Sequence, residues 1–113
     1  MSRRIEKLQE EIRHRATEIL LYEMEDPRLR DVTITRVRLT GDLGFARIYY
    51  EAAPAERRSE VEKALQRAAG FVRKGLAGRL QLRLAPQIEF FYDETQEEIR
   101  RVEELFAKKG SSF

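Results

Sequence analysis

The amino-acid sequence predicts a single α+β domain in which a three-stranded sheet packs against helices. Helical and strand-like hydrophobic periods alternate along the chain in the order α, β, β, α, β, α, and the second helical region is interrupted. The chain has 113 residues, 42% of them apolar. A chain of this length forms one hydrophobic core and has no room for a second. We expect the domain to cover residues 4–108, between short tails at 1–3 and 109–113.

The first helix is predicted over residues 4–24. Its apolar residues recur every three or four positions, as on one face of an α-helix: Ile5, Leu8, Ile12, Ala16, Ile19 and Leu20. Asp26-Pro27 sets its end, because a residue before proline is pushed out of the helical region and proline cannot continue the hydrogen-bond ladder.

Two strands follow, over residues 32–40 and 43–52, joined by a turn at Gly41-Asp42 to form a hairpin. The apolar alternation of the first strand changes phase between Ile34 and Val37, which predicts a β-bulge near Thr35. The second strand places one set of side chains on each face. Ala46, Ile48 and Tyr50 share one face, and Phe45, Arg47 and Tyr49 share the other.

The next helical region begins either at Pro54–Arg58 or at the capping-box spacing Ser59-Glu60-Val61-Glu62, and the sequence leaves both starts open. Its periodicity continues to about Leu76. The buried stripe comprises Val61, Leu65, Ala68, Val72 and Leu76. Gly70 is a weak internal interruption, and Gly75 and Gly78 are stronger reasons for the helix to end.

The final elements are a strand over residues 88–92 and a helix introduced by a second capping box, Thr95-Gln96-Glu97-Glu98. Asp93 and Glu94 stand at the turn between them, where carboxylates favour a helix N-terminus. The apolar stripe of the last helix comprises Ile99, Val102, Leu105 and Phe106.

Charge is distributed unevenly. Residues 67–86 contain five basic side chains and no acidic one, whereas residues 89–104 contain seven acids against two arginines, a net charge of −5. The face of the second helix opposite its apolar stripe contains Lys63, Arg67, Gly70, Arg73 and Lys74. A glycine among cations allows a phosphate or sugar to approach the backbone, a pattern that indicates nucleic-acid contact. A solvated helix face is the other interpretation.

Two further features allow alternatives. Gly75-Leu76-Ala77-Gly78 has the spacing of a GxxG loop that clamps single-stranded nucleic acid, but helix termination also explains both glycines. Phe45 and Tyr49 share a strand face with Arg47 and suit base stacking, although core or edge packing is the favoured explanation. Arg36 and Arg38 share a strand face and either extend the basic surface or are merely solvated.

The sequence does not indicate an enzyme. The only histidine, His14, faces solvent on the first helix, Ser59 suits a helix cap, and the chain has no cysteine. We therefore expect no catalytic residue, metal site, cofactor or small-molecule substrate. The absence of an apolar run of membrane-spanning length predicts a cytoplasmic protein without membrane contact.

Four segments together resemble the ribosome-binding factor A family, over roughly residues 4–106. They are Asp26-Pro27-Arg28-Leu29, Ala46-Arg47-Ile48-Tyr49, Ala68-Ala69-Gly70-Phe71-Val72-Arg73 and Pro86-Gln87-Ile88-Glu89-Phe90-Phe91-Tyr92-Asp93. The resemblance implies a KH-like domain of type II topology, α-β-β-α-kink-α-β-α, in which Ala68-Ala69-Gly70 matches an interhelical kink. Many family members extend further at the C-terminus in a charged tail, whereas this sequence ends at Phe113, so the resemblance is not extended to tail contacts.

By this resemblance the protein is expected to bind the free small (30S) ribosomal subunit, to support late maturation of 16S rRNA, including its 5′ end, and to matter for growth in the cold. We expect it to act as a monomer. The residues predicted to contact RNA are Lys63, Arg67, Gly70, Arg73, Lys74, Arg79 and Arg83, with Arg36, Arg38 and Arg47 as possible additions. The alternatives are a stand-alone single-stranded-RNA-binding KH module or RNA chaperone, and an adaptor that binds proteins through the acidic last helix.

Overall fold

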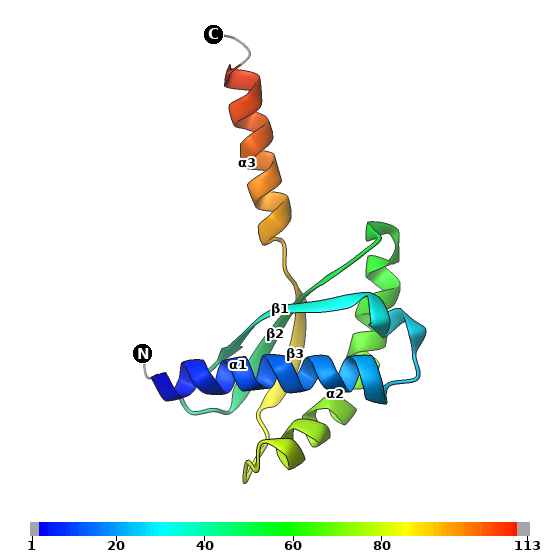
Figure 1. Ribbon diagram of the computed structural model, residues 1–113, viewed down its shortest axis with the longest axis vertical. Coiled ribbons are helices and arrows are strands. Elements are labelled where there is room, and N and C mark those ends of the chain that lie inside the picture. The colour runs from blue at the N-terminus through cyan, green and yellow to red at the C-terminus, as the bar shows by residue number, and fades with distance from the viewer. Residues whose placement is uncertain (1–2, 111–113) are drawn as a thin grey trace.

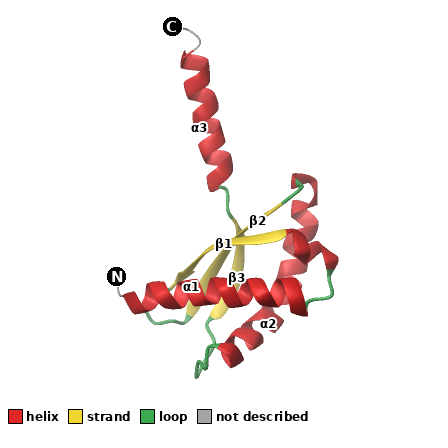
Figure 2. Ribbon diagram, viewed as in Figure 1, coloured by secondary structure: helices red, strands yellow, loops and turns green. Residues whose placement is uncertain are grey.

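The computed structural model describes residues 3–110 and has the predicted α+β architecture (Figure 2). The main elements are α1 (Arg3–Glu18), β1 (Val32–Leu39), β2 (Phe45–Ala52), α2 (Arg58–Arg79), β3 (Gln87–Tyr92) and α3 (Thr95–Gly110). Of the predicted tails, residues 1–2 and 111–113 lie outside the described residues. Residue 3 begins α1, and residues 109–110 end α3.

The three strands form one sheet in the order β1-β2-β3. β1 and β2 pair antiparallel as the predicted hairpin, whereas β2 and β3 pair in parallel. A parallel pair needs a crossover connection, and α2 supplies it. α1 packs against β1 and α2 against β3, on the face to which the buried strand residues point. The opposite face of the sheet has no helix on it among the described elements.

The predicted β-bulge is confirmed. Ile34 pairs with Tyr50 and Arg36 with Tyr49, so Thr35 has no partner in the β1–β2 register. The extra residue restores the phase of the strand, and both Ile34 and Val37 are buried as a result. The Thr35 hydroxyl donates a 2.5 Å hydrogen bond to Oδ2 of Asp93, which directly follows β3.

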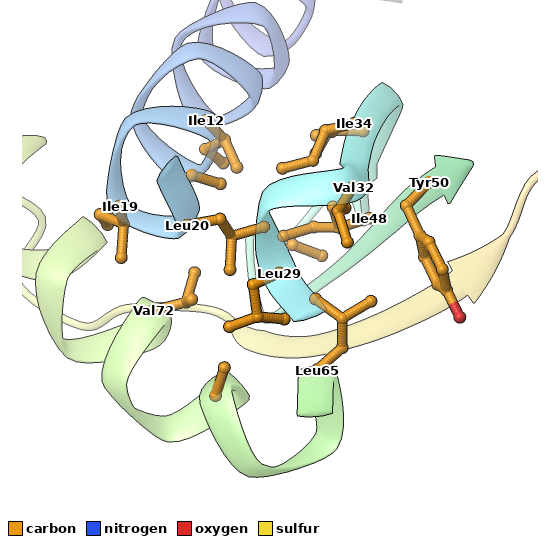
Figure 3. Close-up of a cluster of buried hydrophobic side chains, with 14 of the residues drawn as sticks. Ile12, Ile19, Leu20, Leu29, Val32, Ile34, Ile48, Tyr50, Leu65 and Val72 are labelled. Carbon is orange, nitrogen blue, oxygen red and sulfur yellow. The ribbon is translucent and has the colours of Figure 1, made fainter. Parts of the chain in front are cut away.

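The core lies between the two helices and the sheet, and Figure 3 shows its side chains converging from α1, β1, β2 and α2. The predicted grouping of the β2 side chains is confirmed, and the structure shows which group faces the core: Ala46, Ile48 and Tyr50 are all buried. Leu29 adds a contribution from outside the regular elements. It belongs to a 3₁₀ turn, Pro27–Asp31, and is completely buried.

The first helical segment ends close to its predicted limit. α1 continues into a π-helical turn, Ile19–Glu23, and Met24 is extended. Asp26 then caps the 3₁₀ turn, because its Oδ1 accepts a 3.0 Å hydrogen bond from the Arg28 amide, and its carboxylate forms an ion pair with the Arg28 guanidinium. The Arg28 side chain and amide together lower the pKa of Asp26 to about 2.

α2 is one continuous helix of 22 residues, Arg58–Arg79, so it continues past the predicted end near Leu76. Its bounds also decide the points that the sequence left open, and they change the expectation of an interhelical kink. It begins at Arg58, after a 3₁₀ turn at Ala55–Arg57, and Ser59 is therefore not its cap. Ala68-Ala69-Gly70 does not divide it into two helices; instead the ribbon bends near the middle of α2 while remaining helical (Figure 1). Gly75 and Gly78 lie within the helix, so a GxxG loop does not form there.

The three glycines of α2 have different surroundings, which predicts different effects of a methyl group. Apart from the adjoining helix backbone, no atom lies within 4 Å of the Cβ positions at Gly70 and Gly78, whereas at Gly75 Cδ1 of the buried Ile19 lies 2.8 Å away and Nη1 of Arg79 lies 2.9 Å away. Gly70→Ala and Gly78→Ala should each stabilise the protein by up to about 1 kcal/mol, because alanine is the better helix former.

The Gly75→Ala variant should not gain this stability and should be less stable than the Gly70→Ala and Gly78→Ala variants. The added methyl group forces Ile19 to move from its position in the core. Urea unfolding of the three single variants measures the difference. Destabilisation by Gly70→Ala would show that its backbone is strained in solution. Equal stabilisation at all three sites would show that the packing between the π-helical turn and α2 is loose.

α3 projects away from the rest of the molecule (Figure 1). Its predicted apolar stripe exists but is not buried: Ile99, Val102, Leu105 and Phe106 are 45–69% exposed. The predicted capping box does not form among the hydrogen bonds of the described residues. Thr95 is the first helical residue, and Asp93 serves the helix start by accepting a 3.0 Å hydrogen bond from the Thr95 amide.

Candidate nucleic-acid interface

The outer face of α2 has basic side chains that are not engaged in hydrogen bonds or ion pairs within the described protein. Lys63, Arg67 and Lys74 are exposed and, within residues 3–107, form no hydrogen bond or ion pair. Helical spacing places them on one side, because positions 63, 67, 70 and 74 repeat every three or four residues. These side chains are therefore free to bind phosphates.

Gly70 lies on the same face and is exposed. The space that a Cβ would occupy is open. A phosphate or sugar can thus approach the helix backbone between Arg67 and Lys74 without meeting a side chain at this position. Of the two alanines before it, Ala68 is buried in the core and Ala69 is half-buried, so they pack the helix rather than face a ligand.

Arg73 and Arg79 are predicted to contact RNA, but the side chains of both already bind other groups of the protein. Arg73 is half-buried and donates hydrogen bonds of 3.1 and 3.2 Å to the carbonyl oxygens of Ala85 and Pro86. It thereby connects α2 to the loop before β3. Arg79 donates to the Gly75 carbonyl oxygen and forms an ion pair with Glu23 at the end of the π-helical turn.

Arg83 belongs to the loop of residues 80–86 that joins α2 to β3, and its side chain is exposed. Gln81 in this loop has a positive φ of 52°, in the left-handed region. Leu84 beside Arg83 is 82% exposed. The loop extends the basic surface beyond the end of α2.

The three additional arginines lie elsewhere, on the face of the sheet that α1 and α2 leave uncovered. Arg38 pairs in register with Arg47, and both are exposed. Arg36 lies over the ring of Tyr49, with 4.1 Å between its guanidinium carbon and the ring centre. The predicted site residues thus form two surfaces, one on α2 and one on the sheet.

Asp93 is a buried carboxylate for which the sequence predicted only a role at a helix start. Burial raises its pKa, but hydrogen bonds from Thr35 and Thr95 and the charge of Arg36 outweigh this effect and hold the pKa below its ordinary value. The Arg36 Nε lies 3.9 Å from Oδ2 of Asp93. Asp93 therefore connects the bulge, the sheet-face arginine and the start of α3.

The described residues contain no group of three or more His, Cys, Asp or Glu side chains that could hold a metal ion. His14 is exposed, as predicted, with Nε2 3.4 Å from a carboxylate oxygen of Glu10. Among the described residues, no helix is both long and apolar enough to cross a membrane.

Comparison with known proteins identifies relatives over most of the chain. Residues 4–106 match the family model for ribosome-binding factor A. The ribosome-binding factor A of Methylobacillus flagellatus is 37% identical over 103 residues, which cover 90% of this chain and 81% of that protein. The corresponding protein of Thioalkalivibrio sulfidiphilus is 35% identical over 106 residues, or 93% of this chain and 82% of that protein.

Solved structures agree with these matches. The crystal structure of ribosome-binding factor A from Thermus thermophilus superposes with a TM-score of 0.71 at 30% identity, covering 78% of this chain and 93% of that one. A homology model of the Thermus thermophilus factor, fitted into the cryo-EM map of a 30S complex, matches with a TM-score of 0.65 at 31% identity, covering 78% of this chain and 93% of that one. The fold is KH-like, as the sequence resemblance implied, and the chain belongs to the ribosome-binding factor A family.

Proposed function

We propose that this protein is a ribosome assembly factor that binds the free 30S subunit. The observation that carries the proposal is the outer face of α2, where Lys63, Arg67 and Lys74 surround an exposed glycine and form no hydrogen bond or ion pair within the described protein. Cations left free by the fold suit the phosphate backbone of ribosomal RNA. The homology model fitted to a 30S complex supports the same partner for a relative.

The finer role rests on family membership. We propose that the bound protein supports late maturation of 16S rRNA, including its 5′ end, and contributes to growth in the cold. It acts without catalysis, as a cytoplasmic monomer that binds RNA through its surface. A stand-alone RNA chaperone or single-stranded-RNA-binding module without a ribosomal role is the alternative, and sedimentation separates the two.

Subunit binding should depend on salt through the α2 cations. We expect the protein to co-sediment with free small subunits, and Lys63, Arg67 and Lys74 changed together to Gln should weaken this binding. Removing one cation–phosphate interaction lowers the slope of log K against log salt by about one, so the slope of the triple variant should fall by up to about three. Sedimentation in sucrose gradients at several salt concentrations measures both quantities.

The matched control removes three exposed cations from other elements, Lys7, Arg100 and Arg101, and changes the net charge by the same amount. It should leave the slope close to that of the wild type. Equal decreases in the two triple variants would show a dependence on net charge alone. Protein found only in the light fractions at every salt concentration would support the chaperone alternative.

A further inference from the structure

The uncovered face of the sheet is basic around β1 and β2. Arg36 and Arg38 point out from β1 and Arg47 from β2, and the register places Arg38 directly beside Arg47. Three acids share this face: Glu51 toward one end of β2, Glu89 on β3 beside Arg47, and Asp93 just after β3, with Oδ2 3.9 Å from the Arg36 Nε. Positive charge is therefore concentrated on the side of the sheet formed by β1 and the first half of β2.

Aromatic rings lie between these arginines. Tyr49 and Phe91 are neighbours across the β2–β3 pair, with ring centres 5.8 Å apart. The guanidinium carbon of Arg36 lies 4.1 Å from the centre of the Tyr49 ring, and that of Arg47 lies 5.6 Å from the centre of the Phe91 ring. The rings hold the guanidinium groups over the sheet while Arg36 stays half exposed, with 48% of its side chain accessible.

A hollow of about 440 Å³ opens on the same face. Its lining comprises Arg38, Leu39, Thr40, Phe45, Arg47 and Tyr49. This volume lies within the range of small-ligand sites, roughly 300 to 1,000 Å³. Two cations and two aromatic rings at one hollow match the two parts of a nucleotide, because arginine binds the phosphate and an aromatic ring stacks on the base.

We propose that this sheet face binds unpaired nucleotides of single-stranded RNA, as a second RNA site separate from α2. Arg38 and Arg47 bind phosphates, a base enters the hollow against Phe45 and Tyr49, and the Arg36 guanidinium offers a further stacking surface. Bases in a duplex are already stacked on one another, so the site favours unpaired RNA. The proposal does not depend on small-subunit binding, because it concerns different residues.

The first test uses a fluorescently labelled single-stranded oligouridine of about eight nucleotides, a length within the site size of sheet-based single-strand binders. Fluorescence anisotropy compares Arg38→Gln/Arg47→Gln with Lys63→Gln/Lys74→Gln, which removes the same charge from α2. All four positions are exposed, so both variants should fold. We expect the affinity of the sheet variant to fall about tenfold or more and that of the α2 variant to fall less. A larger decrease in the α2 variant would overturn the proposal.

The second test separates stacking from simple charge attraction. An abasic oligomer of the same length presents the same phosphates without bases. The wild type should bind the oligouridine roughly 5- to 150-fold more tightly than the abasic strand, the range expected for one stacked base. Phe45→Leu keeps an apolar side chain but removes the ring, and should reduce this ratio. Equal affinity of the wild type for the two strands, or equal competition by an oligo-aspartate peptide, would contradict the proposal.

Discussion

Replacing Leu29 with alanine is expected to lower the free energy of unfolding by about 2 to 5 kcal/mol. Leu29 is completely buried although it comes from a 3₁₀ turn rather than a main helix or strand. Its removal leaves a cavity between the turn and α2 that the neighbouring elements cannot easily fill, because Asp26 and Arg28 fix the turn through their ion pair. Urea unfolding followed by circular dichroism measures the change.

Leu84 provides the matched control for this substitution. It also lies outside the main helices and strands, but it is 82% exposed. Leu84→Ala should therefore change the free energy of unfolding by no more than about 0.5 kcal/mol. A similar decrease in both variants would show that the turn of residues 27–31 does not hold its leucine in the core.

The second large effect is expected at Asp93. Asp93→Asn should destabilise the protein by about 1.5 to 3 kcal/mol at neutral pH, the value of hydrogen bonds to a buried charged group. The carboxylate accepts from the Thr35 hydroxyl and from the Thr95 amide. An amide has one oxygen for these two donors, so one donor is left without its partner. Thr35→Val removes only one of the two bonds and should destabilise the protein less.

The Asp93 contribution should also depend on pH. The pKa of the folded carboxyl lies below its ordinary value of 3.8, so the stabilisation is fully present above about pH 5 and is lost as the pH falls through the folded pKa. The difference in stability between wild type and Asp93→Asn should therefore be constant from pH 7 to about 5 and shrink below 4. Unfolding midpoints across this range measure it. A constant difference down to strong acid would show that the carboxylate is not the source.

The sequence predicted the order of the elements and which side chains share a strand face, because these depend on local periodicity. The phase change in β1 located the bulge at Thr35, since a strand that buries both Ile34 and Val37 needs one extra residue. Element boundaries were less predictable. Gly75 and Gly78 were expected to end the helix after about Leu76, but α2 continues to Arg79. The close approach of Ile19 makes glycine suitable at position 75 inside the helix, and that approach joins positions distant in sequence.

The contrast between local periodicity and contacts distant in sequence also explains which site residues could be predicted. The helical period placed Lys63, Arg67 and Lys74 on one exposed face, as the structure also does. It could not show that Arg73 is bound by two backbone carbonyls across the following loop, or that Arg79 pairs with Glu23. Sequence patterns indicate which way a side chain points along a helix, but not which distant acceptor lies there.

The exposed apolar stripe of α3 affects how this helix moves relative to the rest of the molecule. Its apolar stripe remains in water, so beyond its first turns the helix is held mainly by its own backbone hydrogen bonds. Isolated helices shorter than about 12 to 15 residues are marginal in water even for alanine-rich sequences. The 16-residue α3 is close to this limit, so we expect it to have a helix–coil equilibrium of its own and its amide hydrogens to exchange through local opening. Amides in the middle of α2, which packs on the sheet, are expected to exchange more slowly.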